Sequence, residues 1–197
     1  RFRRSLVNER GHTLVEMLTV VSILIVFGTL SMPHIRAYSA EVHLTGAGQV
    51  FRGEFRKARS MAVTRGVYTA LRFEAADGGW NLSIYADGNR NGVRSSEIAS
   101  GIDRRVSGPR QLTTGSGDVR VAINPRTPAI PPERGTLDPS DPIRFGQSNM
   151  LSFSPLGTAT PGTFYLAGDF AQAAVRVNPA SSRVRLMVCR GGRWRER

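Results

Sequence analysis

Residues that could do acid–base, nucleophilic or metal chemistry are few in this sequence. The three histidines are His12, His34 and His43, and the single cysteine is Cys189. A Ser–His pair, a histidine ligand set and a cysteine zinc cluster all need such residues in the folded body of the chain. Because residues 44–197 contain no histidine, the sequence predicts a protein that is not an enzyme.

One acidic segment has part of the spacing of a calcium-binding loop. Asp87, Asn89 and Asn91 alternate and are followed by a glycine, which matches D-x-[DN]-x-[DN]-G. The second half of the pattern differs, because the bidentate acid belongs at Ile98 and Glu97 stands one residue early. Asp and Asn also build turns between strands without a metal. The sequence favours such a turn and leaves Ca²⁺, held by Asp87, Asn89, Asn91 and Glu97, as the cofactor to test.

Basic residues gather at the two ends of the chain, whose net charge is +12. The last fifteen residues contain six arginines and one glutamate, whereas residues 67–182 contain eleven basic and ten acidic residues. Guanidinium groups neutralise phosphates and an indole stacks on bases. Candidate contacts with single-stranded DNA are therefore Arg183, Arg185, Arg193, Trp194 and Arg195. A solvated basic tail or contact with an acidic partner subunit explains the same residues.

The first element that must position these residues is an apolar segment. Residues 17–35 are 19 residues without a formal charge when His34 is neutral. A helix of this length, at about 1.5 Å per residue, spans roughly the hydrocarbon core of a bilayer. Four arginines precede the segment and only Arg36 follows it closely. This bias predicts a cytoplasmic N-terminus and a C-terminal domain in the periplasm or outside the cell.

Glu16 stands at the start of the apolar segment, where burial of an unpaired carboxylate would cost on the order of a few kcal/mol. A cleaved secretory signal has a shorter apolar run, about 7 to 15 residues, followed by a small-residue cleavage site. The run here is longer and no A-x-A site follows it. These features favour a retained anchor helix in which Glu16 has a specific role.

The N-terminal motif Gly11-x-Thr13-Leu14-x-Glu16 resembles the signal of type IV pilins and type II secretion pseudopilins. The resemblance implies that a prepilin peptidase cleaves between Gly11 and His12 on the cytoplasmic side, so that residues 1–11 are a leader peptide. It also implies that Glu16, fifth in the mature chain, meets the N-terminal amine of a neighbouring subunit during assembly. His12 stands where the family usually has Phe, which bears on N-methylation of the new terminus.

Hydrophobic periodicity predicts one long helix from about residue 12 to 65, with a transmembrane half (12–35) and an amphipathic half (36–66). Pro33 should kink or interrupt it. After residue 66 apolar residues recur at every second position. This alternation predicts strands within residues 67–73, 80–84, 119–123, 151–153, 164–166, 175–177 and 184–188. The expected fold class is α+β, with an antiparallel sheet packed on the helix and a domain over residues 67–197. Residues 125–142 hold six of the eleven prolines and are expected to form an extended surface loop.

The domain also resembles the GspH/FimT family of minor pseudopilins and minor pilins. The resemblance rests on three stretches, namely FRKARS-x-A-x-x-RG at residues 55–66, LSFSPLGTA at residues 151–159 and RVR at residues 183–185. It implies the pilin fold. The FimT branch is linked to DNA uptake through a G-R-x-R motif, which residues 192–195 match and residues 182–185 match except at the first position.

Together these features predict a minor pseudopilin or minor pilin, anchored by one helix in the bacterial inner membrane and then assembled into a pseudopilus or pilus. The expected partners are a prepilin peptidase, other pilin-like subunits, the inner membrane and a secreted substrate. The alternative is a FimT-like minor pilin whose C-terminal arginines bind DNA. The sequence leaves open which of the two machines the subunit serves.

Overall fold

The computed structural model describes residues 13–77, 79–112 and 118–197. The chain forms two compact units, residues 1–39 and residues 40–197. The first helix, α1 (Leu14–Arg65), has 52 residues and contributes to both units. Gly66, at a φ of 65°, follows its last turn. Helical structure is continuous through residue 33, so the predicted interruption does not occur there.

The unit of residues 40–197 contains two antiparallel sheets in place of the single predicted sheet. The first has the order β3-β2-β1-β5. Its strands are β1 (Thr69–Ala76), β2 (Gly79–Ala86), β3 (Arg104–Gln111) and β5 (Met150–Phe153). A short helix, α2 (Ser95–Ser100), stands between β2 and β3 in the sequence. The pairing of Leu71 with Ile84 and Leu151 fixes the register of β1 with β2 and with β5.

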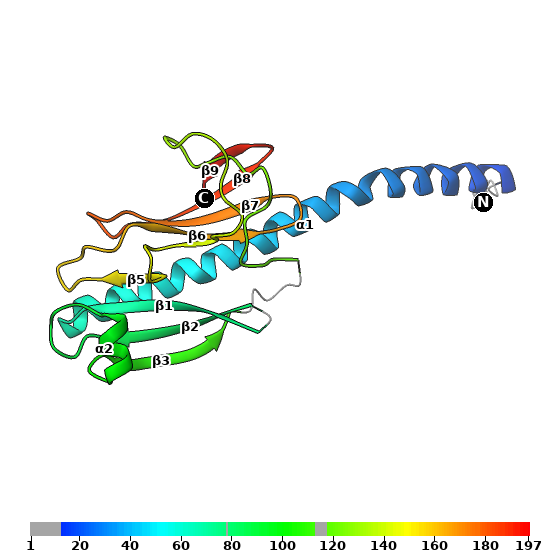
Figure 1. The fold of residues 1–197 in the computed structure, drawn as a ribbon. Coiled ribbons are helices and arrows are strands. Elements are labelled where there is room, and N and C mark those ends of the chain that lie inside the picture. Colours follow the sequence, from blue (N-terminus) through cyan, green and yellow to red (C-terminus); the bar gives the residue numbers. More distant parts are fainter. Residues whose placement is uncertain (1–12, 78, 113–117) are drawn as a thin grey trace, which may run out of the picture. The chain divides into compact units, whose positions relative to one another are not determined.

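The second sheet has the order β4-β6-β7-β8-β9. Its strands are β4 (Ile143–Arg144), β6 (Gly162–Ala167), β7 (Gln172–Val177), β8 (Val184–Arg190) and β9 (Arg193–Glu196). Both sheets lie along the part of α1 that belongs to the same unit (Figure 1). β9 stands last in the strand order and is therefore an edge strand. The turn between β8 and β9 is made by Gly191 and Gly192, both at positive φ.

Residues 119–123 do not form the predicted strand. Apart from an isolated bridge between Arg120 and Ala167, this stretch has no strand pairing. Its alternating apolar residues serve different clusters, because Val119 packs in the main core and Ile123 packs in a second, smaller cluster. The period of two therefore reflects a chain that crosses between two clusters.

The main core lies between the two sheets and residues 40–65 of α1. Phe55 is fully buried, and its ring centroid lies 6.2, 5.9 and 6.1 Å from those of Phe73, Phe145 and Phe164. Phe51, one helical turn earlier, lies 4.5 Å from Phe164. These aromatic side chains connect α1 to both sheets, and the arrangement confirms the predicted α+β fold.

The proline-rich residues 125–142 cover the opposite face of the second sheet. Ile130 and Leu137 are buried there with Tyr165 of β6 and Ala174 of β7. Val175, next to Ala174, is buried in the main core. The central strand β7 is thus covered on both faces, so this segment contributes to packing as well as to the surface.

Candidate functional site

The first part of α1 is long and apolar enough to cross a membrane. None of its most apolar 18-residue window is buried within the protein. Thr19, Ser22, Thr29 and Ser31 each donate a hydrogen bond to a carbonyl oxygen three or four residues earlier, at 2.7–2.9 Å. A bilayer core offers no water to such hydroxyls, so bonding within the helix satisfies them. This part of α1 therefore has the properties of a transmembrane anchor.

Glu16 occupies the third position of α1. Its backbone N–H donates to the Thr13 hydroxyl at 3.2 Å, and the N–H of Met17 donates to the Thr13 carbonyl at 3.2 Å. Thr13 is thus the N-cap residue, and Thr-x-x-Glu is the spacing of a capping box. A carboxylate in the first turn also favours the positive end of the helix dipole. The predicted cleavage position, Gly11 and His12, lies outside the described residues.

The candidate DNA contacts form a hairpin whose arginines divide between the two faces of the second sheet. Arg183 and Arg185 lie on the face turned away from α1, at 3.4 and 3.8 Å from the Glu196 carboxylate. Arg193 and Arg195 alternate with Trp194 and Glu196 along β9 and therefore lie on the other face. The structure does not bring the two arginine pairs into one surface.

Trp194 is held against the domain. Its indole Nε1–H donates to the carbonyl of Pro128 at 3.0 Å, and its half-buried ring packs against the second cluster together with Met187. This contact fixes the end of the chain to the proline-rich segment. The indole is therefore already occupied, and stacking on a base would require it to leave this position.

A second group of charged residues joins the same hairpin to α1. Glu41 accepts hydrogen bonds from Arg190 at 3.0 Å and from Arg197 at 2.7 Å. With Arg193, Arg195 and Val188, these residues line a depression of about 160 Å³. The sequence contains no local signal for this cluster, because Glu41 is 149 and 156 residues away from its two partners.

The predicted calcium loop follows β2, and its side chains bond to the loop's own backbone. Asp87 is buried, and its carboxylate accepts from the backbone N–H groups of Asn89, Arg90 and Gly92 at 2.7–2.9 Å. Asn91 donates from its side-chain amide to Glu97 at 2.7 Å.

Asp103 reinforces the same loop. One of its carboxylate oxygens accepts from the N–H of Gly88 and the other from the N–H of Arg94. Within residues 13–77, 79–112 and 118–197, no three acidic, histidine or cysteine side chains are grouped to hold a metal ion. Backbone hydrogen bonds to Asp87 and Asp103 account for the conformation of this loop.

Replacement of Asp87 by alanine should destabilise the domain without any dependence on calcium. The change leaves three backbone N–H groups without their acceptor, which costs about 3 kcal/mol and lowers Tm by about 5–10 °C. The measurement is thermal unfolding with and without Ca²⁺ at about 1 mM, a concentration above the dissociation constants of sensor sites. Asp77→Ala, at an exposed turn, is the matched control. A rise in Tm with Ca²⁺ that Asp87→Ala abolishes would instead establish a calcium site.

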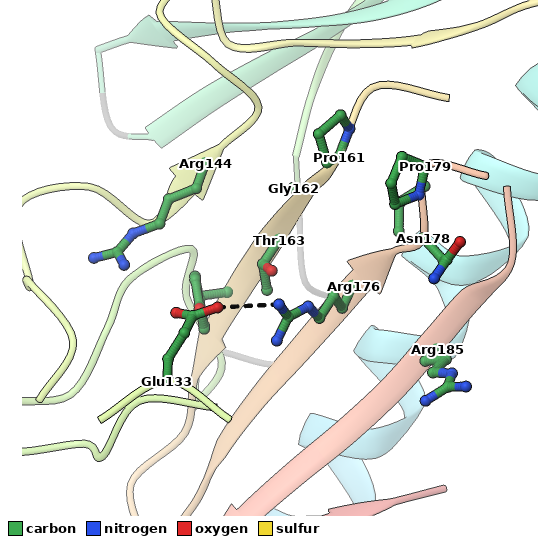
Figure 2. Close-up of a pocket in the computed structure, with 11 residues that line it drawn as sticks. Glu133, Arg144, Pro161, Gly162, Thr163, Arg176, Asn178, Pro179 and Arg185 are labelled. Carbon is green, nitrogen blue, oxygen red and sulfur yellow. Dashed lines mark hydrogen bonds and ion pairs between the residues drawn. The ribbon is translucent and has the colours of Figure 1, made fainter. Parts of the chain in front are cut away.

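A pocket of about 390 Å³ lies on the face of the second sheet that is turned away from α1. At its centre Arg176 donates to Glu133 at 3.0 Å, with Arg144 and Arg185 on either side (Figure 2). The Arg144 guanidinium lies 5.6 Å from the centroid of the Tyr165 ring. Burial raises the pKa of the Tyr165 hydroxyl, and the charge of Arg144 opposes this shift. Glu133 lines the pocket and is bound by Arg176, and with Arg144 and Arg185 beside this pair the described lining is positively charged.

An apolar N-terminal helix whose second part packs on antiparallel sheets defines a pilin-like protein. The chain matches the family model of the type II transport protein GspH over residues 47–181. This match covers more than half of the chain, which therefore belongs to the GspH family. No curated protein and no solved structure matches the chain.

Proposed function

We propose that this GspH-family chain is a minor pseudopilin, anchored in the inner membrane by the first part of α1 and assembled through that helix into a type II secretion pseudopilus. The observation that carries the proposal is Glu16, an acidic residue in the first turn of a helix long and apolar enough to span a bilayer. A carboxylate at the edge of the hydrocarbon core is stabilised by an ion pair with a cation. The function is structural and involves no catalysis by this chain.

The cation is the N-terminal amine of a neighbouring subunit, released when a prepilin peptidase cleaves between Gly11 and His12. The new terminus precedes the N-cap Thr13 by one residue and therefore stands at the positive end of its own helix dipole. A carboxylate from outside the helix stabilises the positive charge of an amine placed there, and Glu16 of the next subunit supplies this carboxylate. The charge pair sets the axial register between adjacent helices.

Cleavage predicts a mature chain that begins at His12. Mass spectrometry of the protein isolated from cells with an active prepilin peptidase should show the loss of residues 1–11, and cells without the peptidase should retain them. The same spectrum reports whether the His12 amine is methylated. A mature chain that begins after Ser39 or Ala40 would show a cleaved secretory signal and would remove the anchor on which the proposal rests.

The other partners follow from this role. The apolar part of α1 contacts the inner membrane before assembly and other pseudopilin helices afterwards. The domain of residues 40–197 faces the periplasm, as the arginines ahead of the span favour. There it meets neighbouring domains and the secreted substrate.

A FimT-like minor pilin that captures DNA is the alternative. This alternative requires the four arginines of the two motifs to contact the same DNA strand. The sheet places Arg183 and Arg185 on one face and Arg193 and Arg195 on the other. Trp194 is bonded to Pro128. These two observations favour the pseudopilin. Binding of single-stranded DNA that falls steeply with salt, and that is lost when the four arginines are neutralised, would favour the alternative.

A further inference from the structure

One end of the domain carries an exposed phenylalanine beside a group of arginines. Phe170 belongs to the turn between β6 and β7, and its side chain is 58% exposed. The neighbouring turn between β8 and β9 lies beside it, because Phe170, Gly191 and Gly192 line a common depression. The arginine–phenylalanine surface consists of Phe170, Arg190, Arg193, Arg195 and Arg197.

This surface packs on the first turns of α1 within the domain. Arg190 and Arg197 reach Glu41, and the turn that carries Phe170 approaches Leu44, whose Cδ2 lies 3.4 Å from an ideal Cβ placed on Gly168. The opposite end of the domain is marked by Thr69, shortly after the end of α1, which pairs with Phe153. The surface therefore lies at the end of the domain where α1 begins its packing.

Positive charge is in excess on this surface. Glu41 is only 15% exposed, and its two oxygens are bound by Arg190 and Arg197. In the part of the chain that the structure describes, neither Arg193 nor Arg195 forms an ion pair with a carboxylate. Two other acidic residues stand close by, Asp169 in the turn before Phe170 and Asp118, which lies 3.7 Å from His43. The two unpaired guanidinium groups are free to bind an anion.

Glu41 and Leu44 follow the apolar segment by only six and nine residues, since that segment ends at residue 35. Even a fully extended chain covers at most about 3.6 Å per residue, so six residues bridge roughly 20 Å. Whatever direction the domain takes from the bilayer, Glu41 stays within this distance of the end of the apolar segment, and Arg190 and Arg197 are bound to Glu41. An exposed aromatic ring with arginines beside it is the combination found at membrane interfaces.

We propose that the arginine–phenylalanine surface binds anionic phospholipid headgroups of the leaflet from which the domain emerges. Arg193 and Arg195 bind the phosphate groups, Arg190 and Arg197 add to the positive field, and Phe170 inserts between headgroups. This contact rests on the proposed membrane anchor and holds the unassembled subunit at the bilayer surface. Entry into a filament then exchanges headgroup contacts for contacts with neighbouring subunits.

The full chain in lipid nanodiscs provides the test. Hydrogen exchange is measured for residues 168–171 and 190–197 in discs of phosphatidylcholine alone and in discs that contain about 30% phosphatidylglycerol, an anionic lipid. Each arginine near an anionic membrane surface strengthens the binding equilibrium between protein and membrane about fivefold. We expect exchange in the anionic discs to be about tenfold slower or more, and to recover in high salt.

Two pairs of variants separate this surface from the general charge of the domain. Arg193→Gln with Arg195→Gln should abolish the protection, whereas Arg104→Gln with Arg105→Gln, on the exposed strand β3, should leave it unchanged. Phe170→Ala should weaken it, whereas Leu156→Ala, 92% exposed on the turn that follows Phe153, should not.

Equal exchange in both kinds of disc, or protection that persists in the Arg193 and Arg195 double variant, overturns the proposal. Protection by a single-stranded oligonucleotide, with none by phosphatidylglycerol, also overturns it and assigns the surface to nucleic acid. Failure of the chain to enter nanodiscs is a different result, because it contradicts the membrane anchor of the proposed function.

Discussion

Replacing Glu16 with alanine should remove the chain from assembled pseudopili while leaving its domain folded. The substitution leaves the neighbouring amine at low dielectric without its counter-charge, which costs about 3–5 kcal/mol. The subunit's association constant should then fall by more than about a hundredfold. The measurement is the fraction of the chain recovered with sheared filaments, compared with the fraction that stays in the membrane.

Two matched variants identify the cause of such a loss. Glu16→Gln keeps the size of the side chain and removes its charge, so it should fail nearly as completely as Glu16→Ala. Thr13→Ala removes the N-cap hydroxyl and keeps the charge, so it should lose only about 1 kcal/mol of helix stability and still assemble. Incorporation of Glu16→Ala at the parent level would refute the charge pair. An equal loss with Thr13→Ala would assign the effect to the start of the helix.

Replacing Phe55 with alanine should produce the largest loss of stability in the domain. The ring is fully buried between α1 and both sheets, so the change leaves a cavity where three other aromatic rings meet. Such substitutions cost about 3–5 kcal/mol. Urea unfolding of the full chain in detergent, followed by circular dichroism, should show a lower midpoint with an unchanged slope.

Phe55→Leu and Phe170→Ala serve as controls for this prediction. Leucine fills much of the space that the Phe55 ring occupies, so Phe55→Leu should lose less than half of the unfolding free energy that Phe55→Ala loses. Phe170 is exposed, so its truncation should change the free energy of unfolding by less than about 0.5 kcal/mol in the absence of lipid. A Phe55→Ala variant as stable as the parent would show that α1 is not the element that holds the two sheets together.

The elements that the sequence predicted well are those with strong periodicity. The helix was expected over residues 12–65 and is observed as Leu14–Arg65. β2, β5, β6, β7 and β8 include the segments in which apolar residues alternate, and β1 begins two residues later than the predicted segment 67–73. These patterns are readable because one face of each element packs in the main core, so burial sets the residue types directly.

Two of the missed strands, β3 and β9, bury little apolar surface of their own. β3 is exposed along its whole length and contains Arg, Ser, Gly, Pro and Gln, so neither period nor propensity marks it. β9 has four residues, and its Gly191–Gly192 turn is as compatible with a flexible tail as with a hairpin. The wrong strand at residues 119–123 shows the reverse case, in which alternation arose from two separate clusters.

The candidate site was predictable only where its signal was local. The Thr13–Glu16 spacing and the Asp87 loop are contained within a few residues, and the structure gives both a definite local geometry. The division of the C-terminal arginines between two faces depends on the pairing of β8 with β9. The Glu41 cluster depends on contacts across most of the chain, which no short motif encodes.

In the assembled pseudopilus, we expect Glu16 of one subunit to contact the N-terminal amine of the next. Zero-length carbodiimide coupling of assembled pseudopili, followed by mass spectrometry, tests it directly, because the reagent joins a carboxylate and an amine only when they touch. We expect a cross-linked peptide that joins Glu16 to the mature N-terminus of a neighbouring subunit. Coupling of Glu16 only to its own amine, or no coupling while other carboxylate–amine links form, would contradict it.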